Sequence, residues 1–240
     1  LRDSGVDCTR VVVSPDFSTT TKVRVLAGQH YAARQPVIRI DYENNNALND
    51  DVVADIHRNL EEASETADAI VRSDYNYGAA DGAVGKLAAT IAKRRNIPLI
   101  VDSRFRLAEF AGATTATPNQ DEVEQILGEN FDENDCAELC RRLGFEALLV
   151  TRGNLGMLLT DRNAAPRTFA SIGSKEPIDV TGAGDTVIAV YSLGLACGLG
   201  FAESANLANH AGGIVVMKKG TASVSPAELL RSLNGEHPAE

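Results

Sequence analysis

The sequence predicts an α/β protein with a mostly parallel central sheet flanked by helices and a small β lid. Short apolar runs at 69–72, 98–102 and 147–151 alternate with segments of helical periodicity. Such alternation is typical of parallel strands that helices cover on both faces. The β-branched residues gathered between positions 10 and 42 do not follow this rhythm, so they indicate a separate small sheet.

Each element follows from a local pattern. Clusters of β-branched residues predict strands at 11–13, 19–26 and 37–42, and the polar residues 44–49 predict a turn and a helix start. Residues 155–180 are expected to hold short strands separated by Gly and Pro turns. Helices are expected at 52–67, 82–96, 119–127, 133–143, 182–197, 202–217 and 226–233.

Length and composition suit one domain. With 240 residues and 44% hydrophobic side chains, the chain can bury a sizeable core. We interpret residues 1–240 as a single domain, with the lid and accessory strands at about 10–42 and the α/β core at about 50–240. The chain has no initiator Met and begins in mid-pattern, so we expect that an N-terminal segment of the domain is absent.

Charge excludes some classes of partner. The formal net charge of -10 argues against a nucleic-acid surface, which needs a basic footprint. No apolar run is long enough to span a membrane, and the first residues lack the apolar segment of a signal peptide. The four cysteines form no CxxC pair and the four histidines are scattered, so we expect reduced thiols, no zinc site and a cytoplasmic location.

The most informative stretch is DVTGAGD, from Asp179 to Asp185. Gly182 and Gly184 stand where the chain turns from a short strand into an apolar helix, whose first N–H groups have no intrahelical acceptor. Together with the helix dipole, these groups make an anion site. Asp185 beside it is expected to be ionised and able to take a proton from an attacking hydroxyl. The alternative is a glycine-rich cap that only lets helix and strand pack closely.

DVTGAGD resembles the C-terminal signature of the ribokinase (PfkB) family of carbohydrate kinases. This resemblance implies a ribokinase-like fold and the ATP-dependent transfer of phosphate to a sugar hydroxyl. It also implies Asp185 as the catalytic base, and Gly182, Ala183 and Gly184 as the anion hole. ATP and Mg²⁺ are the implied cofactors.

Other segments resemble the family's nucleotide site in the expected order. Asn119 and Glu122, in TPNQDE, match an N-x-x-E motif that organises Mg²⁺ and phosphate, although an N-capped helix explains them equally well. Thr151 and Gly153, in LLVTRGNLGM, match positions near the phosphates or ribose, or form an ordinary turn. Asn209 matches a polar position beside the adenine, although an isolated Asn on a helix is also expected at the surface.

Two further expectations come from the resemblance. Many family members bind a monovalent cation near the anion hole, which implies a K⁺ site around Asp179, Thr181 and Gly220. Many also pair through the lid, which implies a homodimer in which Tyr31, Val37, Ile38 and Ile40 form the contact. The alternative for these four residues is that they cover the sugar site or pack locally.

Within the family, the spelling DVTGAGDTVIA and the run SDYNYG resemble the heptose-7-phosphate kinase branch. The implied acceptor is the C1 hydroxyl of D-glycero-D-manno-heptose 7-phosphate. Tyr77 stands where that branch commonly has Lys, but Arg104 can bind a phosphate with two parallel hydrogen bonds. The alternatives are a kinase of another sugar or nucleoside, or a nucleotide-binding fragment that does not turn over.

Overall fold

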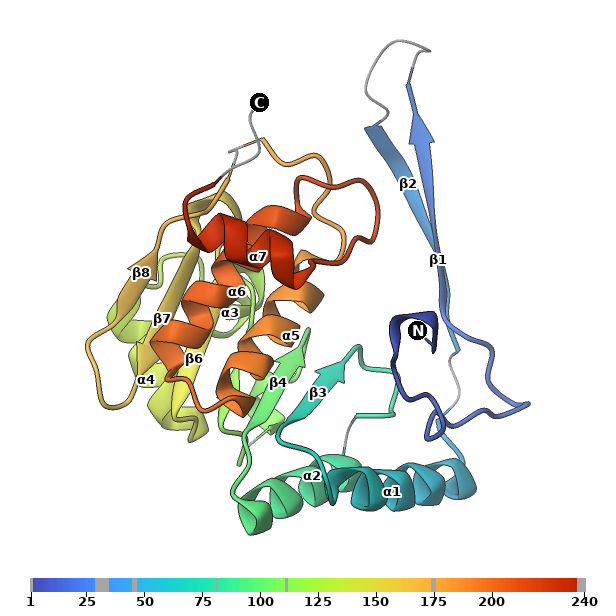
Figure 1. Ribbon diagram of the computed structural model, residues 1–240. Helices are drawn as coiled ribbons and strands as arrows, with labels where there is room; N and C mark the ends of the chain where they lie inside the picture. Colours follow the sequence, from blue (N-terminus) through green and yellow to red (C-terminus); the bar gives the residue numbers. More distant parts are fainter. Residues whose placement is uncertain are drawn as a thin grey trace.

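The computed structural model describes residues 2–28, 35–44, 47–80, 82–110, 112–173 and 176–236. In these ranges a six-stranded sheet lies between two layers of helices, and a two-stranded ribbon projects away from it (Figure 1). Tyr31, one of the residues expected at a dimer contact, lies outside the described residues.

The central sheet is mostly parallel, as the sequence predicts. Its strands follow one another in chain order, so that each strand pairs with the next. The first four are parallel and the last two run antiparallel to their neighbours. In order they are β3 (Ile70–Asp74), β4 (Leu99–Ser103), β5 (Thr115–Ala116), β6 (Ala147–Thr151), β7 (Met157–Asp161) and β8 (Arg167–Phe169).

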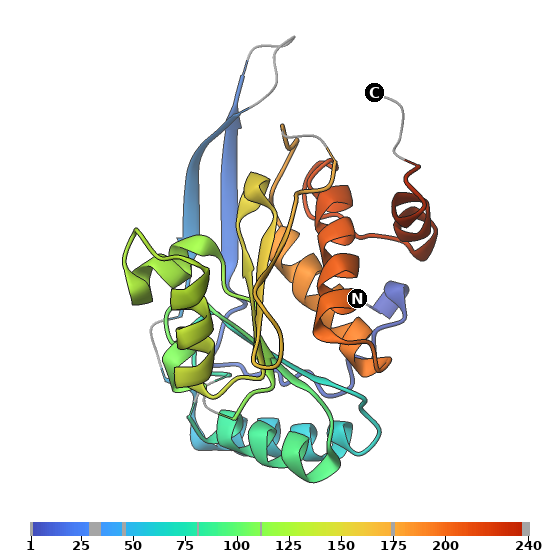
Figure 2. The same cartoon turned by 90° about the vertical axis from the view of Figure 1, so that its left-hand side faces the viewer.

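Helices cover both faces of this sheet (Figure 2). One face carries α2 (Gly82–Arg95), α3 (Gln120–Leu127) and α4 (Glu133–Leu143), with α1 (Asp50–Ser64) packed on α2. The other face carries α5 (Ala183–Ala196) and α6 (Phe201–Val215), with α7 (Pro226–Leu233) packed on α6. No helix of the described residues combines the length and the apolar character needed to cross a bilayer.

Alternation along the central strands explains why they form unbroken apolar runs. Val101 and Leu148 enter the core on the α2–α4 side, while Ile100 and Leu149 enter the core on the α5–α6 side. All four side chains are fully buried. Tyr191 of α5 is buried as well, and its hydroxyl lies 3.2 Å from Thr115 Oγ1, which ties that helix to the middle of the sheet.

The lid is a long antiparallel ribbon of β1 (Thr21–Ala27) and β2 (Gln35–Tyr42). Cross-strand partners share a face, so pairing Lys22 with Asp41 and Val23 with Ile40 separates a charged face from an apolar face. We call these the charged face and the apolar face of the lid. The apolar face is solvent-exposed at Val23, Val25, Ile38, Ile40 and Tyr42.

Two predicted strands are wrong, and one short strand was not predicted. Residues 11–13 form no strand, since no partner strand pairs with them and Val13 remains 88% exposed. The stretch just before Gly182 is not a strand either, because the N–H groups of Ile178 and Asp179 both donate to the carbonyl of Val216. The two-residue strand β5 was not predicted, because so short an element leaves no periodic pattern.

A buried carboxylate joins the loop after β3 to the loop after β4. Asp74 is only 3% exposed and accepts hydrogen bonds from Arg106 Nη2 at 2.8 Å, from Ser103 Oγ at 2.9 Å and from the Asn76 N–H at 2.9 Å. Burial alone would raise the pKa of Asp74, but the hydrogen bonds from Arg106, Asn76 and Ser103 outweigh it and lower the pKa. The run SDYNYG (73–78) therefore begins with a buried anchor at the end of β3.

Replacing Asp74 by Ala should lower the free energy of unfolding by about 3–5 kcal/mol, because it removes one partner of a buried ion pair. Urea denaturation measures the change. Asp55→Ala is the control, since Asp55 and Arg58 form an exposed pair on α1 and its loss should cost no more than about 0.5 kcal/mol. Equal losses in the two variants would contradict a structural role for Asp74.

Candidate active site

Predicted and unpredicted site residues meet at the carboxyl ends of the parallel strands. Tyr75 follows β3, Asp102 lies near the end of β4, and Asn119, just beyond β5, forms a bridge with Thr151, the last residue of β6. The first turn of α5 approaches the same edge, because Asp185 accepts a hydrogen bond from Tyr75. Ligands of open α/β sheets bind at this edge, so the fold places these residues where a site is expected.

The start of α5 has the features of an anion-binding turn. Gly182, its N-cap, has φ 81°, in the left-handed region that favours glycine, and no side chain caps the helix. In the described part of the chain, the N–H groups of Gly184 and Asp185 have no backbone or side-chain acceptor. A Cβ at Gly182 or Gly184 would meet no atom within 4 Å, so the space above the turn is open. The turn can therefore receive an anion.

Asp185 lies beside this turn and is exposed, not buried in the core. Its Oδ1 accepts a hydrogen bond of 3.0 Å from the Tyr75 hydroxyl. Burial and the negative charge of Asp185 raise the pKa of Tyr75 to about 12, so the phenol keeps its proton near neutral pH. An ionised carboxylate at this position is able to accept a proton from a ligand.

Two more carboxylates crowd the same edge. Burial raises the pKa of Asp102 to about 6, and the charge of Asp185 adds to the rise. Burial also raises the pKa of Glu122 to about 7, with a contribution from Asp102, while Arg104 opposes both shifts. Clusters of perturbed carboxylates are typical of functional sites.

The capping interpretation of Asn119 and Glu122 is confirmed. The Asn119 side chain accepts from the Glu122 N–H, and the Glu122 carboxylate accepts from the Asn119 N–H, both at 2.9 Å. This reciprocal arrangement is a capping box at the start of α3. A magnesium role for the two residues stays a prediction.

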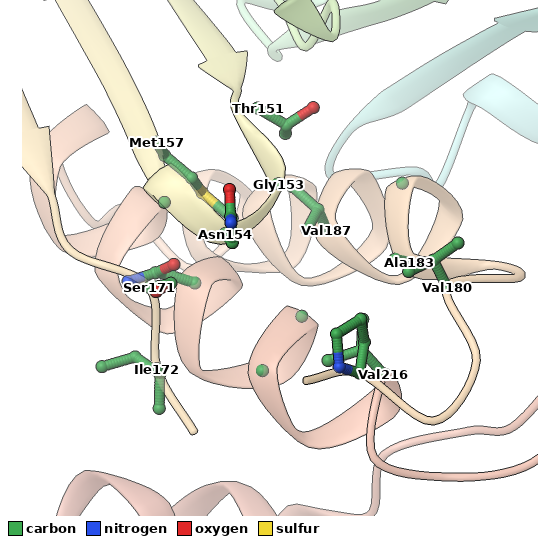
Figure 3. A pocket seen from close by; sticks show the side chains of 16 residues that line it. Thr151, Gly153, Asn154, Met157, Ser171, Ile172, Val180, Ala183, Val187 and Val216 are labelled. Atoms are coloured by element: carbon green, nitrogen blue, oxygen red, sulfur yellow. The ribbon is translucent and has the colours of Figure 1, made fainter. Parts of the chain in front are cut away.

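A first cavity, the α5–α6 hollow, lies between the loop after β6 and helices α5 and α6 (Figure 3). Its lining is mostly apolar and includes the predicted residues Thr151, Gly153, Ala183, Gly184 and Asn209. Asn209 is 5% exposed, and its Nδ2 donates to the Ala170 carbonyl at 2.7 Å, so the alternative of a surface position is wrong. The hydrogen bond holds the chain at Ala170, next to the hollow wall at Ser171 and Ile172.

A second cavity, the lid hollow, has a volume of about 710 Å³ and lies between the ribbon and the loops after β3 and β4. The Tyr77 hydroxyl bridges the lid to the body, since it accepts from Lys22 Nζ at 3.1 Å and donates to Glu43. Arg104 lines this hollow, with its guanidinium 5.2 Å from the centre of the Tyr75 ring. Other lining residues are Arg39, Asp41, Asn44, Asn76 and Phe105.

The residues predicted for a monovalent cation are close together. Asp179 Oδ1 accepts from the Thr181 N–H at 2.9 Å and Oδ2 accepts from the Gly220 N–H at 3.0 Å, and these hydrogen bonds lower the pKa of Asp179. Both oxygens are engaged by backbone donors, and the cation site stays a prediction. Across the residues that the structure describes, no group of three or more His, Cys, Asp or Glu side chains is arranged to hold a metal ion directly.

Sequence reasoning missed Tyr75 and Asp102 as site residues. Their positions in the sequence could have identified them, because each lies at the carboxyl end of a predicted strand or just beyond it. Asp185 adjoins both cavities: it follows Gly184, which lines the α5–α6 hollow, and it contacts Tyr75, which lines the lid hollow.

Comparison with known proteins gives consistent results. Residues 1–228 match the pfkB family carbohydrate kinase domain. The bifunctional protein HldE of Geobacter metallireducens is 38% identical over 97% of this chain and 48% of its own length. HldE of Histophilus somni is 39% identical over 92% of this chain and 46% of its own length. The chain thus spans about half the length of the curated relatives it matches.

Solved structures share the fold at lower identity. Arabidopsis thaliana ribokinase, complexed with ribose and ATP, has a TM-score of 0.64 at 20% identity, over 82% of this chain and 65% of its own. Escherichia coli phosphofructokinase-2, in complex with potassium, has a TM-score of 0.67 at 18% identity, over 82% of this chain and 67% of its own.

The carboxylate cluster predicts a pH dependence of stability that Glu122→Gln should remove. Because folding raises the pKa of Glu122 from 4.5 to about 7, its stabilising contribution is complete below pH 4.5 and is lost as the pH rises to about 7. The variant should therefore gain stability relative to the original chain between pH 4.5 and 8. Urea denaturation over this range measures the difference, and a constant difference would contradict the assignment.

Proposed function

Because the chain belongs to the pfkB family of carbohydrate kinases, we propose that it transfers the γ-phosphate of ATP to a sugar hydroxyl, with Asp185 as the base. The observation that carries this proposal is that Asp185 follows Gly184, which lines the α5–α6 hollow, and contacts Tyr75, which lines the lid hollow. One cavity then holds the nucleotide and the other holds the acceptor, so that the transferred group passes over the first turn of α5.

The α5–α6 hollow suits the nucleotide. Its apolar lining, which includes Met157, Val187 and Val216, matches the flat apolar surface of a base. Thr151 and Gly153 lie at the mouth formed by the loop after β6, where ribose or phosphate would sit. Gly184 lines the end of the same hollow at the helix N-terminus, where the phosphates would meet unpaired N–H groups.

Two groups at the start of α5 then share the chemistry. The carboxylate of Asp185 takes the proton of the acceptor hydroxyl as the hydroxyl oxygen attacks the γ-phosphorus, the bond from the γ-phosphorus to the β–γ bridging oxygen breaks, and ADP leaves. The N–H groups of Gly184 and Asp185, with Gly182 and Ala183 shaping the turn, stabilise the negative charge on the transferring group.

The acidic residues near the nucleotide fit a hydrated magnesium ion. Asp102 and Glu122 have raised pKa values chiefly because they are buried, with smaller contributions from neighbouring carboxylates, and nearby positive charge would lower these pKa values. When bound, Mg²⁺ would neutralise the phosphates and keep much of its water shell. Asn119 and Glu122 would contact that shell. Asp179, Thr181 and the Gly220 loop would hold K⁺ on the other side of the anion turn.

The lid hollow suits a sugar phosphate, and we infer that the acceptor is D-glycero-D-manno-heptose 7-phosphate with its C1 hydroxyl at Asp185. Lys22, Arg39 and Arg104 bring positive charge to the hollow for a phosphate. Asp41 and Glu43 offer acceptors for sugar hydroxyls. Lys22 contacts Tyr77, so a cation from the lid occupies the region where the heptose-specific branch has a lysine at position 77.

The similarity to HldE proteins supports this choice of acceptor. Another sugar or a nucleoside is the alternative acceptor within the family. We also propose that residues 1–240 act as one kinase domain, with the lid at about 10–42 and the core at about 50–240. The cytoplasm, where ATP is available, is the proposed location.

Transfer from ATP should be measured against heptose 7-phosphate, unphosphorylated heptose, hexoses, pentoses and nucleosides. With the best acceptor, Asp185→Asn should lower kcat about 10²–10⁴-fold while ATP affinity changes little, since a lost general base affects only the chemical step. Asp51→Asn, an exposed carboxylate in the first turn of α1, is the control. Full activity of Asp185→Asn would exclude Asp185 as the base, and ATP binding without any transfer would favour a binding fragment.

The apolar face of the lid supports a homodimer. Val23, Val25, Ile38 and Ile40 are between 41% and 55% exposed on one side of a long ribbon, and a second copy of the lid would bury them. Ile38→Lys should convert the dimer to a monomer, because it places a charge in the centre of this contact. Light scattering after gel filtration measures the mass. Arg24→Ser, on the charged face, should leave the mass unchanged, and an unaltered mass for Ile38→Lys would contradict the interface.

A further inference from the structure

Tyr75 has no role in the proposed transfer, although it lines the lid hollow and contacts the proposed base. Its hydroxyl donates to Asp185 Oδ1 at 3.0 Å, and its ring lines the lid hollow beneath Arg104. We propose that Tyr75 is a positioning residue for the base: it holds Oδ1 of Asp185, so that Oδ2 faces the acceptor hydroxyl. This inference rests on the proposed function of Asp185.

The backbone around Tyr75 is fixed on both sides. Before it, Asp74 is held by Arg106 and Ser103. After it, the Asn76 N–H donates to the same carboxylate, and Asn76 adopts a left-handed conformation with φ 64°. The hydrogen bonds of Asp74 and Asn76 therefore fix the backbone on both sides of Tyr75, and the position of the phenol does not depend on the substrate.

Asp185 needs such a partner because its own surroundings do not fix it. It is exposed in the first turn of a helix, and in the described part of the chain no donor contacts its Oδ2. Asp102, on β4, repels it electrostatically, while Arg104 and Tyr75 lie on the other loops of the same edge. One hydrogen bond to Oδ1 sets the plane of the carboxylate and leaves a single oxygen to accept the proton.

Tyr75 cannot replace the base, because it keeps its own proton. Burial and the neighbouring Asp185 raise its pKa to about 12, so near neutral pH the phenol donates only. Asp185 therefore receives the proton from the acceptor hydroxyl, and Tyr75 orients Asp185 without gaining or losing a proton.

The same loop contains a matched control. Tyr77 lies two residues further along, but its hydroxyl contacts Lys22 and Glu43 of the lid and not Asp185. Tyr75→Phe and Tyr77→Phe each remove one phenolic oxygen from the same loop. Only the first removes a contact to the base.

The kinetic test compares the two variants of the full chain with the best acceptor. Tyr75→Phe should lower kcat about 10- to 100-fold while the KM values for ATP and acceptor stay within about twofold, because the misplaced base affects only the transition state. Tyr77→Phe should instead change the KM for the acceptor and leave kcat close to that of the original chain. A kcat for Tyr75→Phe within about twofold of the original chain would overturn the proposal.

A fluorescence test examines the contact without any turnover. The chain has five tyrosines and no tryptophan, so tyrosine emission is observed directly. A phenol hydrogen-bonded to a carboxylate emits weakly, because the excited hydroxyl passes its proton to the acceptor. Asp185→Ala should therefore raise the emission of the original chain and of Tyr77→Phe, but not that of Tyr75→Phe. An equal rise in all three backgrounds would overturn the contact. Failure to phosphorylate any acceptor would contradict the proposed function and with it the catalytic role of Tyr75, whereas the fluorescence result would still decide whether the Tyr75–Asp185 contact exists.

Discussion

Unpaired backbone N–H groups at the start of α5 are the constraint on which the site depends. They exist because the first N–H groups of a helix have no intrahelical acceptor and no side chain caps Gly182, and the space above them is open because neither Gly182 nor Gly184 has a side chain. A helix start left open in this way attracts an anion. The α5–α6 hollow includes Gly184 of this turn, and Asp185 follows it, so both lie next to the position that an anion would occupy.

The same edge of the central sheet also carries a cluster of negatively charged side chains. Asp102, Glu122 and Asp185 stand close enough to influence one another, and two of them have pKa values well above normal. Carboxylates this close together repel one another in the free protein, and a ligand that brings cations would relieve the repulsion. Arg104 compensates part of the charge from the protein itself. The proposed ATP and Mg²⁺ would bring an anion accompanied by positive charge to this edge.

Local features were predictable from the sequence, whereas contacts between distant residues were not. The strand at 147–151 could be recognised because both of its faces are buried, and the turn before α5 because its two glycines, Gly182 and Gly184, are separated by a single residue. The predicted strand at 11–13 failed because β-branched residues still need a partner strand. The Tyr75–Asp185 hydrogen bond joins residues 110 positions apart, and the burial of Asn209 depends on a wall near Ala170, so neither leaves a local pattern.

The two faces of the lid have a consequence for how such a protein can diversify. Neighbouring residues along β1 and β2 point to opposite sides, so Lys22 and Asp41 line the lid hollow while Val23 and Ile40 belong to the outer surface. Substitutions at every second position can therefore change the lining of the hollow while leaving the proposed dimer contact intact, and the reverse also holds. A single pair of strands thus carries two independently evolvable surfaces.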